Sequence, residues 1–255
     1  MKLCNILVFA ALAASSYAGT PALSSPAPAA PASGWWFRAA PYGWLTAIDG
    51  DIGIGSLSAP VDVSMSDTLG NLDMAFMGVF EAGIGKWSLG VDVIYGKISD
   101  DIDAGGRIFD SFRVEQKQWI VTPFVAYRLI DTGRYHMDVF AGARVMAIEA
   151  ELTGRYVDGG QTTRSRDTAW ADPIIGIRGQ AELTDKAFFR YNGDVGGFGV
   201  SSDFAWQAFA GFGYHCTDAI SIAVGYRGLG VDYSKGSVSL DTVTHGPVIG
   251  IEVHW

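Results

Sequence analysis

Cysteine, charge and long apolar runs are all scarce in this chain of 255 residues. The two cysteines, Cys4 and Cys216, form no Cys-x-x-Cys pair, so neither a structural zinc site nor a disulfide scaffold has support. Charged residues make up only 18% of the chain, whereas a disordered protein would be rich in charge and poor in aromatic residues. After residue 34 no apolar run reaches about 18 residues, which excludes a transmembrane helix there.

Basic residues are outnumbered, since 18 Lys and Arg face 27 Asp and Glu and the formal net charge is −9. Nucleic-acid binding therefore has no support, because it needs a basic face. The sequence also lacks a pair of histidines at metal-binding spacing. The acidic run that starts at Asp100 has no distal glutamate to complete a calcium loop. We expect no metal and no cofactor.

The amino terminus has the pattern of an export signal. A basic start at Lys2 precedes the apolar run 3–12, and Ser16 and Ala18 are small residues at the positions that determine cleavage. We predict a signal peptide at residues 1–18. The Pro-, Ala- and Ser-rich residues 19–34 are then a flexible periplasmic tail.

The rest of the chain alternates with the period of two that is typical of β-strands. Between residues 119 and 127, one face carries Trp119 and Tyr127 at its two ends with apolar residues between them. These rings are eight residues apart, which is roughly 26 Å along a strand and about 20 Å of height at the tilt of a membrane barrel. A soluble sandwich also alternates, but here the charged residues share their face with many glycines, as expected in a narrow lumen. Lipid tolerates no unpaired backbone, so strands within it must close into a barrel.

The alternation predicts an all-β, antiparallel up-and-down transmembrane β-barrel of residues 35–255, with ten strands and with twelve or eight as alternatives. Short turns and longer polar segments (49–72, 100–107, 153–168 and 235–242) alternate, which puts both ends of the barrel in the periplasm. Residues 51–64 could add a hairpin, and Ser66–Asp73 could form one helical turn. The expected strands are 36–48, 73–84, 87–100, 108–130, 134–152, 169–183, 187–200, 203–217, 219–234 and 243–255.

The carboxyl end resembles the assembly signal of bacterial outer-membrane barrels, with Gly250, Val253 and a final aromatic residue, Trp255. Segments 58–63, 170–178 and 193–203 resemble a broad group of uncharacterised proteobacterial outer-membrane proteins, which are distantly similar to OmpA-like transmembrane barrels. The resemblance spans residues 35–255. It implies a barrel in the outer membrane, in contact with lipid, lipopolysaccharide and the assembly machinery, and we expect a monomer.

The inward face collects charges of both signs in similar number. Buried charges need partners, so a network that braces the lumen is the favoured interpretation and implies a structural or surface-interaction role. A narrow diffusion pore for small solutes is the alternative. The expected network comprises Arg38, Asp73, Glu81, Asp92, Arg128, Asp138, Arg144, Asp172, Arg178, Glu182, Arg190, Asp194, Arg227 and Glu252.

Catalysis has little support in the sequence, and we expect no enzyme. A membrane-embedded lipid-modifying enzyme would need His245, the one histidine expected at the outer end, near Asp241 and Thr244. His136, His215 and His254 are expected at the periplasmic rim. The segment 153–168 carries three arginines, which suit lipopolysaccharide phosphates: Arg155, Arg164 and Arg166.

Overall fold

The computed structural model of the protein describes residues 34–54, 57–103, 109–236 and 238–255. The predicted signal peptide and all but the last residue of the predicted tail lie outside these ranges. The helix of the described part, α1, spans Met65–Gly70, and no helix there is long and apolar enough to cross a membrane. The strands are β1 (Trp35–Trp44), β2 (Ala47–Ile54), β3 (Leu57–Val63), β4 (Leu72–Ile84), β5 (Trp87–Asp103), β6 (Phe109–Asp131), β7 (Tyr135–Tyr156), β8 (Gln161–Glu182), β9 (Ala187–Gly196), β10 (Phe204–His215), β11 (Ile220–Lys235) and β12 (Val238–His254).

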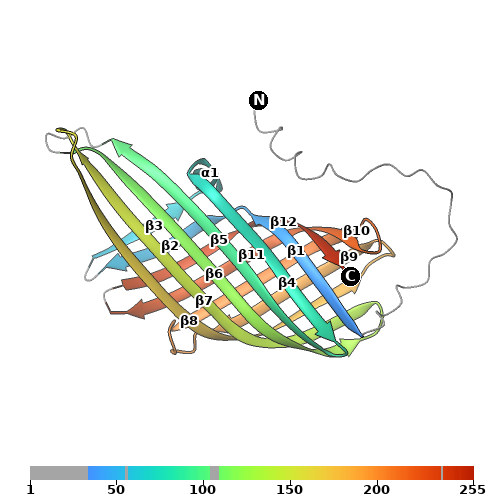
Figure 1. Ribbon diagram of the computed structural model, residues 1–255. Coiled ribbons are helices and arrows are strands. Elements are labelled where there is room, and N and C mark those ends of the chain that lie inside the picture. The colour runs from blue at the N-terminus through green and yellow to red at the C-terminus, as the bar shows by residue number, and fades with distance from the viewer. Residues whose placement is uncertain (1–33, 55–56, 104–108, 237) are drawn as a thin grey trace, which may run out of the picture.

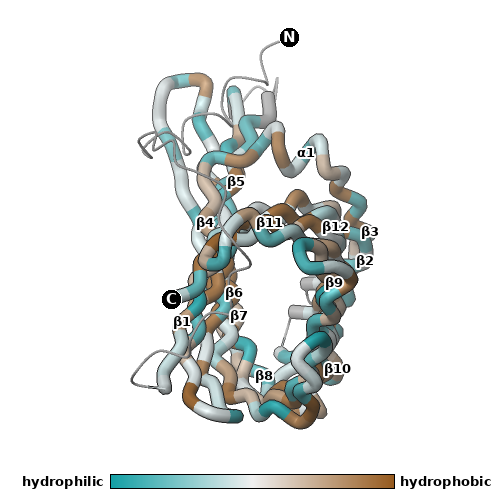
Figure 2. Tube along the Cα trace, turned by 90° about the vertical axis from the view of Figure 1, so that its right-hand side faces the viewer, coloured by the Kyte–Doolittle hydropathy of each residue, from teal (hydrophilic) through white to brown (hydrophobic). Residues whose placement is uncertain are grey.

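The sheet closes on itself because β1 pairs with β4 on one side and with β12 on the other. The ten strands β1 and β4–β12 form the barrel, every neighbouring pair is antiparallel, and β2 and β3 form an extra hairpin. Figure 2 shows the strands as a ring. The predicted up-and-down barrel of about ten strands is confirmed.

The two ends of the barrel differ. Four short turns lie at one end, which we call the short-turn end: 85–86, 132–134, 183–186 and 216–219. The start of β1 and the C-terminus lie at this end too (Figure 1). Gly85 takes a φ of 58°, a left-handed conformation that favours glycine in so tight a turn. The opposite, loop end carries the hairpins of β5 to β8, which extend far beyond the rest of the wall (Figure 1).

The outward face forms an apolar belt bounded by aromatic rings. On β5 and β6, Trp87 packs against Tyr127 near the short-turn end with ring centroids 4.8 Å apart, and Tyr95 packs against Trp119 eight residues further along at 4.5 Å. Beyond Tyr95 and Trp119 the same face becomes charged, with Lys97 on β5. Most side chains of the face that alternation predicted to be apolar are exposed or half-buried over the height of the belt, as a lipid-facing surface requires, and Tyr95 is covered by its neighbours.

Residues 49–72 and 153–168 contain more regular structure than expected. The first segment forms most of β2, with β3 and α1, so the alternative hairpin within 51–64 is close to what is observed. Ser64 caps α1, and its side chain and that of Asp67 bond each other's backbone N–H in a capping box. Most of the second segment belongs to β7 and β8, because the backbone ladder continues beyond the apolar belt.

At the loop end, hydrogen bonds connect neighbouring parts of the barrel wall on one side but not on the other. Ser202, in the loop between β9 and β10, donates from its backbone N–H and its hydroxyl to Asp172 of β8, at 2.7 Å and 2.6 Å. On the other side, β3 pairs only with β2, and β4 pairs only with β5 from Leu72 to Met77. Among the described residues no hydrogen bond or ion pair joins β3 to β4, and α1 bridges them along the chain.

Candidate functional site

The lumen is layered along the barrel axis. Strand β11 shows the order from the short-turn end: polar Ser221, small Ala223 and Gly225, charged Arg227 and apolar Leu229 all face inward. The other strands each contribute to some of these layers. The lumen therefore has a polar rim, a layer of small and aromatic residues, an upper polar layer and an apolar plug.

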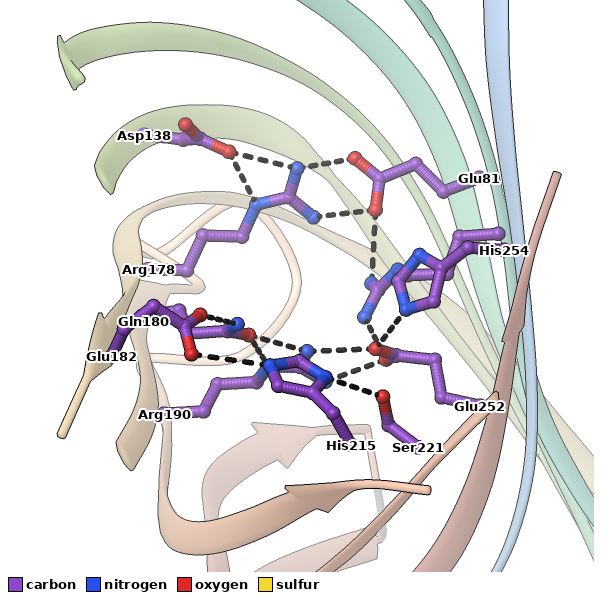
Figure 3. A network of polar contacts seen from close by, with 11 residues as sticks. Glu81, Asp138, Arg178, Gln180, Glu182, Arg190, His215, Ser221, Glu252 and His254 are labelled. Atoms are coloured by element: carbon purple, nitrogen blue, oxygen red, sulfur yellow. Dashed lines mark hydrogen bonds and ion pairs between the residues drawn. The ribbon is translucent and has the colours of Figure 1, made fainter. Parts of the chain in front are cut away.

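Nearest the short-turn end, four arginines and three carboxylates form what we call the arginine belt. Arg38 donates to Glu81 at 2.9 Å and to Glu252 at 2.7 Å. Arg178 crosses the lumen from β8 to Glu81 of β4, and also bonds Asp138 of β7 at 3.1 Å (Figure 3). The remaining contacts join Arg190 to Glu252 at 2.6 Å and Arg128 to Asp138 at 2.9 Å.

Polar neighbours extend the belt around the rim. Gln180 accepts from Arg190 and donates to Glu182 at 2.6 Å. The ring of His215 lies 3.1 Å from Glu182 and 2.9 Å from the hydroxyl of Ser221 (Figure 3). The belt thus connects opposite walls of the barrel through a continuous series of ion pairs and hydrogen bonds, because its members come from strands on opposite sides of the lumen.

The upper polar layer is more deeply buried. Arg227 pairs with Asp92 at 3.0 Å, and the Tyr42 hydroxyl donates to the same carboxylate at 2.7 Å. Arg144 pairs with Asp194 at 2.8 Å, and neither side chain is appreciably exposed. Gln207 accepts from both arginines of this layer and joins the two pairs. Charges buried to this degree are stable only when paired and hydrogen-bonded.

An apolar plug closes the lumen toward the loop end. The ring of Trp170 stacks on Tyr233 at a centroid distance of 4.5 Å, and its indole N–H donates to Asp172 and Ser202, each at 3.2 Å. The plug therefore packs directly against the loop fastened between β9 and β10. Its buried members are Trp44, Ile94, Ile120, Met146, Trp170, Leu229, Val231 and Tyr233.

A cavity of about 650 Å³, which we call the chamber, extends from the rim of the short-turn end past the arginine belt to the upper polar layer. Glycines on its wall leave room for aromatic rings. A Cβ on Gly90 would come within 2.3 Å of the Phe124 ring, and one on Gly225 within 2.6 Å of the Phe209 ring. Because the rings occupy the space over these glycines, they cover the wall without filling the chamber.

The predicted charge network lies in the lumen with one exception. Asp73 faces outward, where it contacts the ammonium of Lys97 at 3.7 Å and accepts from Ser99 at 3.0 Å. A register shift between Leu72 and Met74 interrupts the alternation at this point, so the prediction for Asp73 is wrong. Asp172 faces inward but bonds Ser202 and Trp170 rather than an arginine.

Uncharged polar residues were missed by a search restricted to charge. Gln207, Gln180 and Tyr42 each join two or more charged groups, and Ser202 holds Asp172. All but Ser202, which lies in a loop, sit on the inward face, so the same alternation that found the charges could have found them.

The loop-end candidates do not assemble into one site. The ring of His245 lies between Asp49 at 2.7 Å and the Tyr226 hydroxyl at 2.5 Å, and no hydrogen bond joins it to Asp241 or Thr244 among the described residues. Arg155 projects from one face of the β7–β8 hairpin, whereas Arg164 and Arg166 lie on the other. Within the described ranges, no group of three or more His, Cys, Asp or Glu side chains is placed to hold a metal ion.

Comparisons with known proteins identify the fold. No family model matches the chain, and no curated protein matches it either. Among solved structures it is similar to the outer membrane protease OmpT from Escherichia coli, with 13% identity, a TM-score of 0.55 and coverage of 87% of this chain and 97% of that one. The translocator domain of the autotransporter NalP from Neisseria meningitidis has 13% identity and a TM-score of 0.41, over 86% of this chain and 88% of that one. The likeness to OmpT shows that the fold is that of an outer-membrane β-barrel.

Proposed function

We propose that the protein is a closed, monomeric barrel of the outer membrane with a structural or surface-interaction role, and that it is not an enzyme. The plug carries this proposal. Eight buried apolar side chains fill the lumen at the loop end, and the arginine belt crosses it at the other. A water-filled diffusion pore needs a continuous polar path, so the plug disfavours the narrow-pore alternative.

Conductance in planar lipid bilayers tests the proposal. The wild-type protein is expected to give no steady single-channel steps, because the plug leaves no hydrated path for ions. Insertion is verified on the same preparation by heat-modifiable gel mobility, since folded barrels migrate differently before and after boiling. Steady unitary steps from verified, inserted protein would overturn the closed-barrel role in favour of the pore.

The proposed location rests on the exposed apolar belt and on the predicted export signal of residues 1–18. In this proposal the short-turn end faces the periplasm, as in outer-membrane barrels generally. Trp255 supports delivery by the assembly machinery, because its ring stacks on Phe37 of β1 at 5.8 Å, beside the closing seam. The group of proteobacterial barrels that the sequence motifs resemble is the proposed family.

Lipopolysaccharide is the proposed surface partner. The proposal is supported by the charged residues that follow the apolar belt on the outward face. The first of them are Lys97 and Lys117, which lie opposite each other on β5 and β6, next to the aromatic pair Tyr95 and Trp119. The arginines of the β7–β8 hairpin lie further out on both faces. Replacing Arg155, Arg164 and Arg166 by Gln is expected to reduce the lipopolysaccharide that copurifies with the barrel. Unchanged copurification would remove the arginines from this role.

A further inference from the structure

The chamber has the size and one-sided access of a ligand site. Its volume of about 650 Å³ falls within the range of roughly 300–1,000 Å³ that is usual for small-molecule pockets. It reaches the rim of the short-turn end, where His136 and Trp255 contribute to its lining. The plug closes the other end. A molecule can therefore enter from the short-turn end but cannot pass through.

The middle of the chamber is lined by aromatic side chains, of which Phe124 and Phe140 meet edge to face with ring centroids 5.9 Å apart. Phe124, Phe140 and Phe209 line it, and each ring occupies the space that a side chain would take on a neighbouring glycine. A Cβ on Gly176 would lie 2.6 Å from the Phe140 ring, compared with 2.3 Å for Gly90 and the Phe124 ring and 2.6 Å for Gly225 and the Phe209 ring. An aromatic lining favours a ligand with a ring or another apolar body that can pack edge to face or face to face against it.

The polar lining at the mouth is dominated by guanidinium groups. The side chains of Arg38, Arg128, Arg178 and Arg190 are between 16% and 28% exposed, whereas those of Glu81, Asp138 and Glu252 are between 2% and 5% exposed. The carboxylates are thus covered by the arginines that they bind. Within the belt the guanidinium groups are therefore more exposed than the carboxylates, although the exposed Asp218 also lines the cavity.

We propose that the chamber binds a small amphipathic anion, in which a carboxylate is attached to a flat apolar ring system. The carboxylate lies against the exposed guanidinium edges of the arginine belt, where charge-assisted hydrogen bonds form. The ring system lies deeper, against Phe124, Phe140 and Phe209. Arg128 is the most exposed arginine of the belt; its Nε bonds Asp138 and its Nη1 bonds Asp131, and its Nη2 is the group directed to such an anion in this proposal.

Three isosteric probes separate the contributions of charge and of the apolar walls. The protein is reconstituted in lipid nanodiscs, which leave the short-turn end accessible, and equilibrium dialysis measures binding above that of empty discs. We expect saturable, one-to-one binding of 2-naphthoate, at least tenfold weaker binding of neutral 2-naphthalenemethanol and no binding of the cation 2-naphthylmethylammonium. Binding of the cation as tight as that of the anion would overturn the proposal, as would binding no greater than to empty discs.

Two matched alanine substitutions locate the binding. Ala223 lines the chamber from β11, whereas Ala210 lies on the lipid-facing side of the neighbouring strand β10. Ala223→Phe fills the chamber and is expected to abolish binding of 2-naphthoate, and Ala210→Phe is expected to preserve it. Where heat-modifiable mobility shows that Ala223→Phe does not fold, Ala40→Phe fills the chamber from β1 instead. Equal binding by the filled and lipid-facing variants would place the probe outside the chamber.

Arg128→Gln tests the contact with the anion. Loss of one charge-assisted hydrogen bond is expected to weaken 2-naphthoate binding by about tenfold and to leave 2-naphthalenemethanol unaffected. An equal loss for both probes would show that the substitution disturbs the chamber as a whole, and would count against recognition of the charge.

Discussion

Arg144 and Asp194 show what a single ion pair contributes inside this lumen. Both side chains are out of contact with solvent, and Asp194 is the only carboxylate with which Arg144 forms an ion pair among the described residues. The attraction between the two charges offsets a large desolvation cost. Removing one partner therefore does more harm than removing both, because it leaves an uncompensated charge in the interior.

Asp194→Ala is expected to lower the free energy of unfolding by about 3–5 kcal/mol. Urea titration in lipid vesicles, followed by tryptophan fluorescence, measures this change. Asp241 faces outward on β12 and is exposed, so Asp241→Ala serves as a control that should change stability by less than about 0.5 kcal/mol. The double variant Arg144→Met/Asp194→Leu should lose less than Asp194→Ala alone. Equal stability of Asp194→Ala and the control would contradict the argument.

Two glycines on the inward face of β5 provide a second comparison. A Cβ on Gly90 would meet the Phe124 ring at 2.3 Å, whereas one on Gly96 would meet nothing within 4 Å. Gly90→Val is expected to cost about 1–3 kcal/mol through overpacking, and Gly96→Val is expected to be tolerated. The same urea titration measures the free energy of unfolding of both variants. If Gly96→Val were as unstable as Gly90→Val, contact with the Phe124 ring could not be the cause of the destabilisation.

At the scale of strands, alternation in the sequence predicted which face of each barrel strand meets lipid, because burial imposes a period of two. It failed at Asp73, where a bulge shifts the register. Alternation also placed residues 153–168 outside the strands. Beyond the apolar belt both faces of a hairpin meet water, so hydropathy no longer alternates although the backbone ladder continues.

Partner choice across the lumen could not be predicted in the same way. Arg178 and Glu81 are 97 residues apart and meet only because the barrel closes with a particular tilt and register. Alternation shows that both point inward, but not how far each lies along the axis. The inward set was accessible to sequence reasoning, whereas the separation into a belt, a chamber and a plug was not.

The charged extension beyond the belt should respond to acid. Lys97 donates to Glu115 at 2.9 Å, which raises the pKa of the lysine and lowers the pKa of the glutamate. A lowered carboxyl pKa stabilises the fold above the ordinary glutamate pKa, and this contribution is lost as the pH falls through the lowered value. We expect a small loss of stability there in acid titrations of the unfolding midpoint, and a smaller loss in Lys97→Gln, where Lys117 remains beside Glu115. An identical acid response in Lys97→Gln would refute the assignment, since both groups are partly exposed and the effect depends on their pairing.

For the whole molecule, closure of the lumen depends on the plug rather than on the arginine belt alone. Replacing Trp44, Trp170 and Tyr233 by Ala removes three of its large rings. The triple variant is expected to give conductance steps in planar bilayers that the wild type lacks. A control variant with Trp87→Ala, Trp119→Ala and Tyr214→Ala removes three rings from the lipid-facing side and should remain silent. Silence of the plug variant, verified as inserted, would show that the polar layers seal the barrel by themselves.

The place where β3 and β4 lie unpaired gives the molecule a preferred direction of distortion. A barrel wall that is hydrogen-bonded on one side and unpaired on the other deforms first at the unpaired side when it is strained. Lateral pressure from the surrounding membrane, or a ligand pulling on the far hairpins, would therefore be relieved where α1 alone spans the gap, while the Ser202–Asp172 side stays fixed and acts as the pivot.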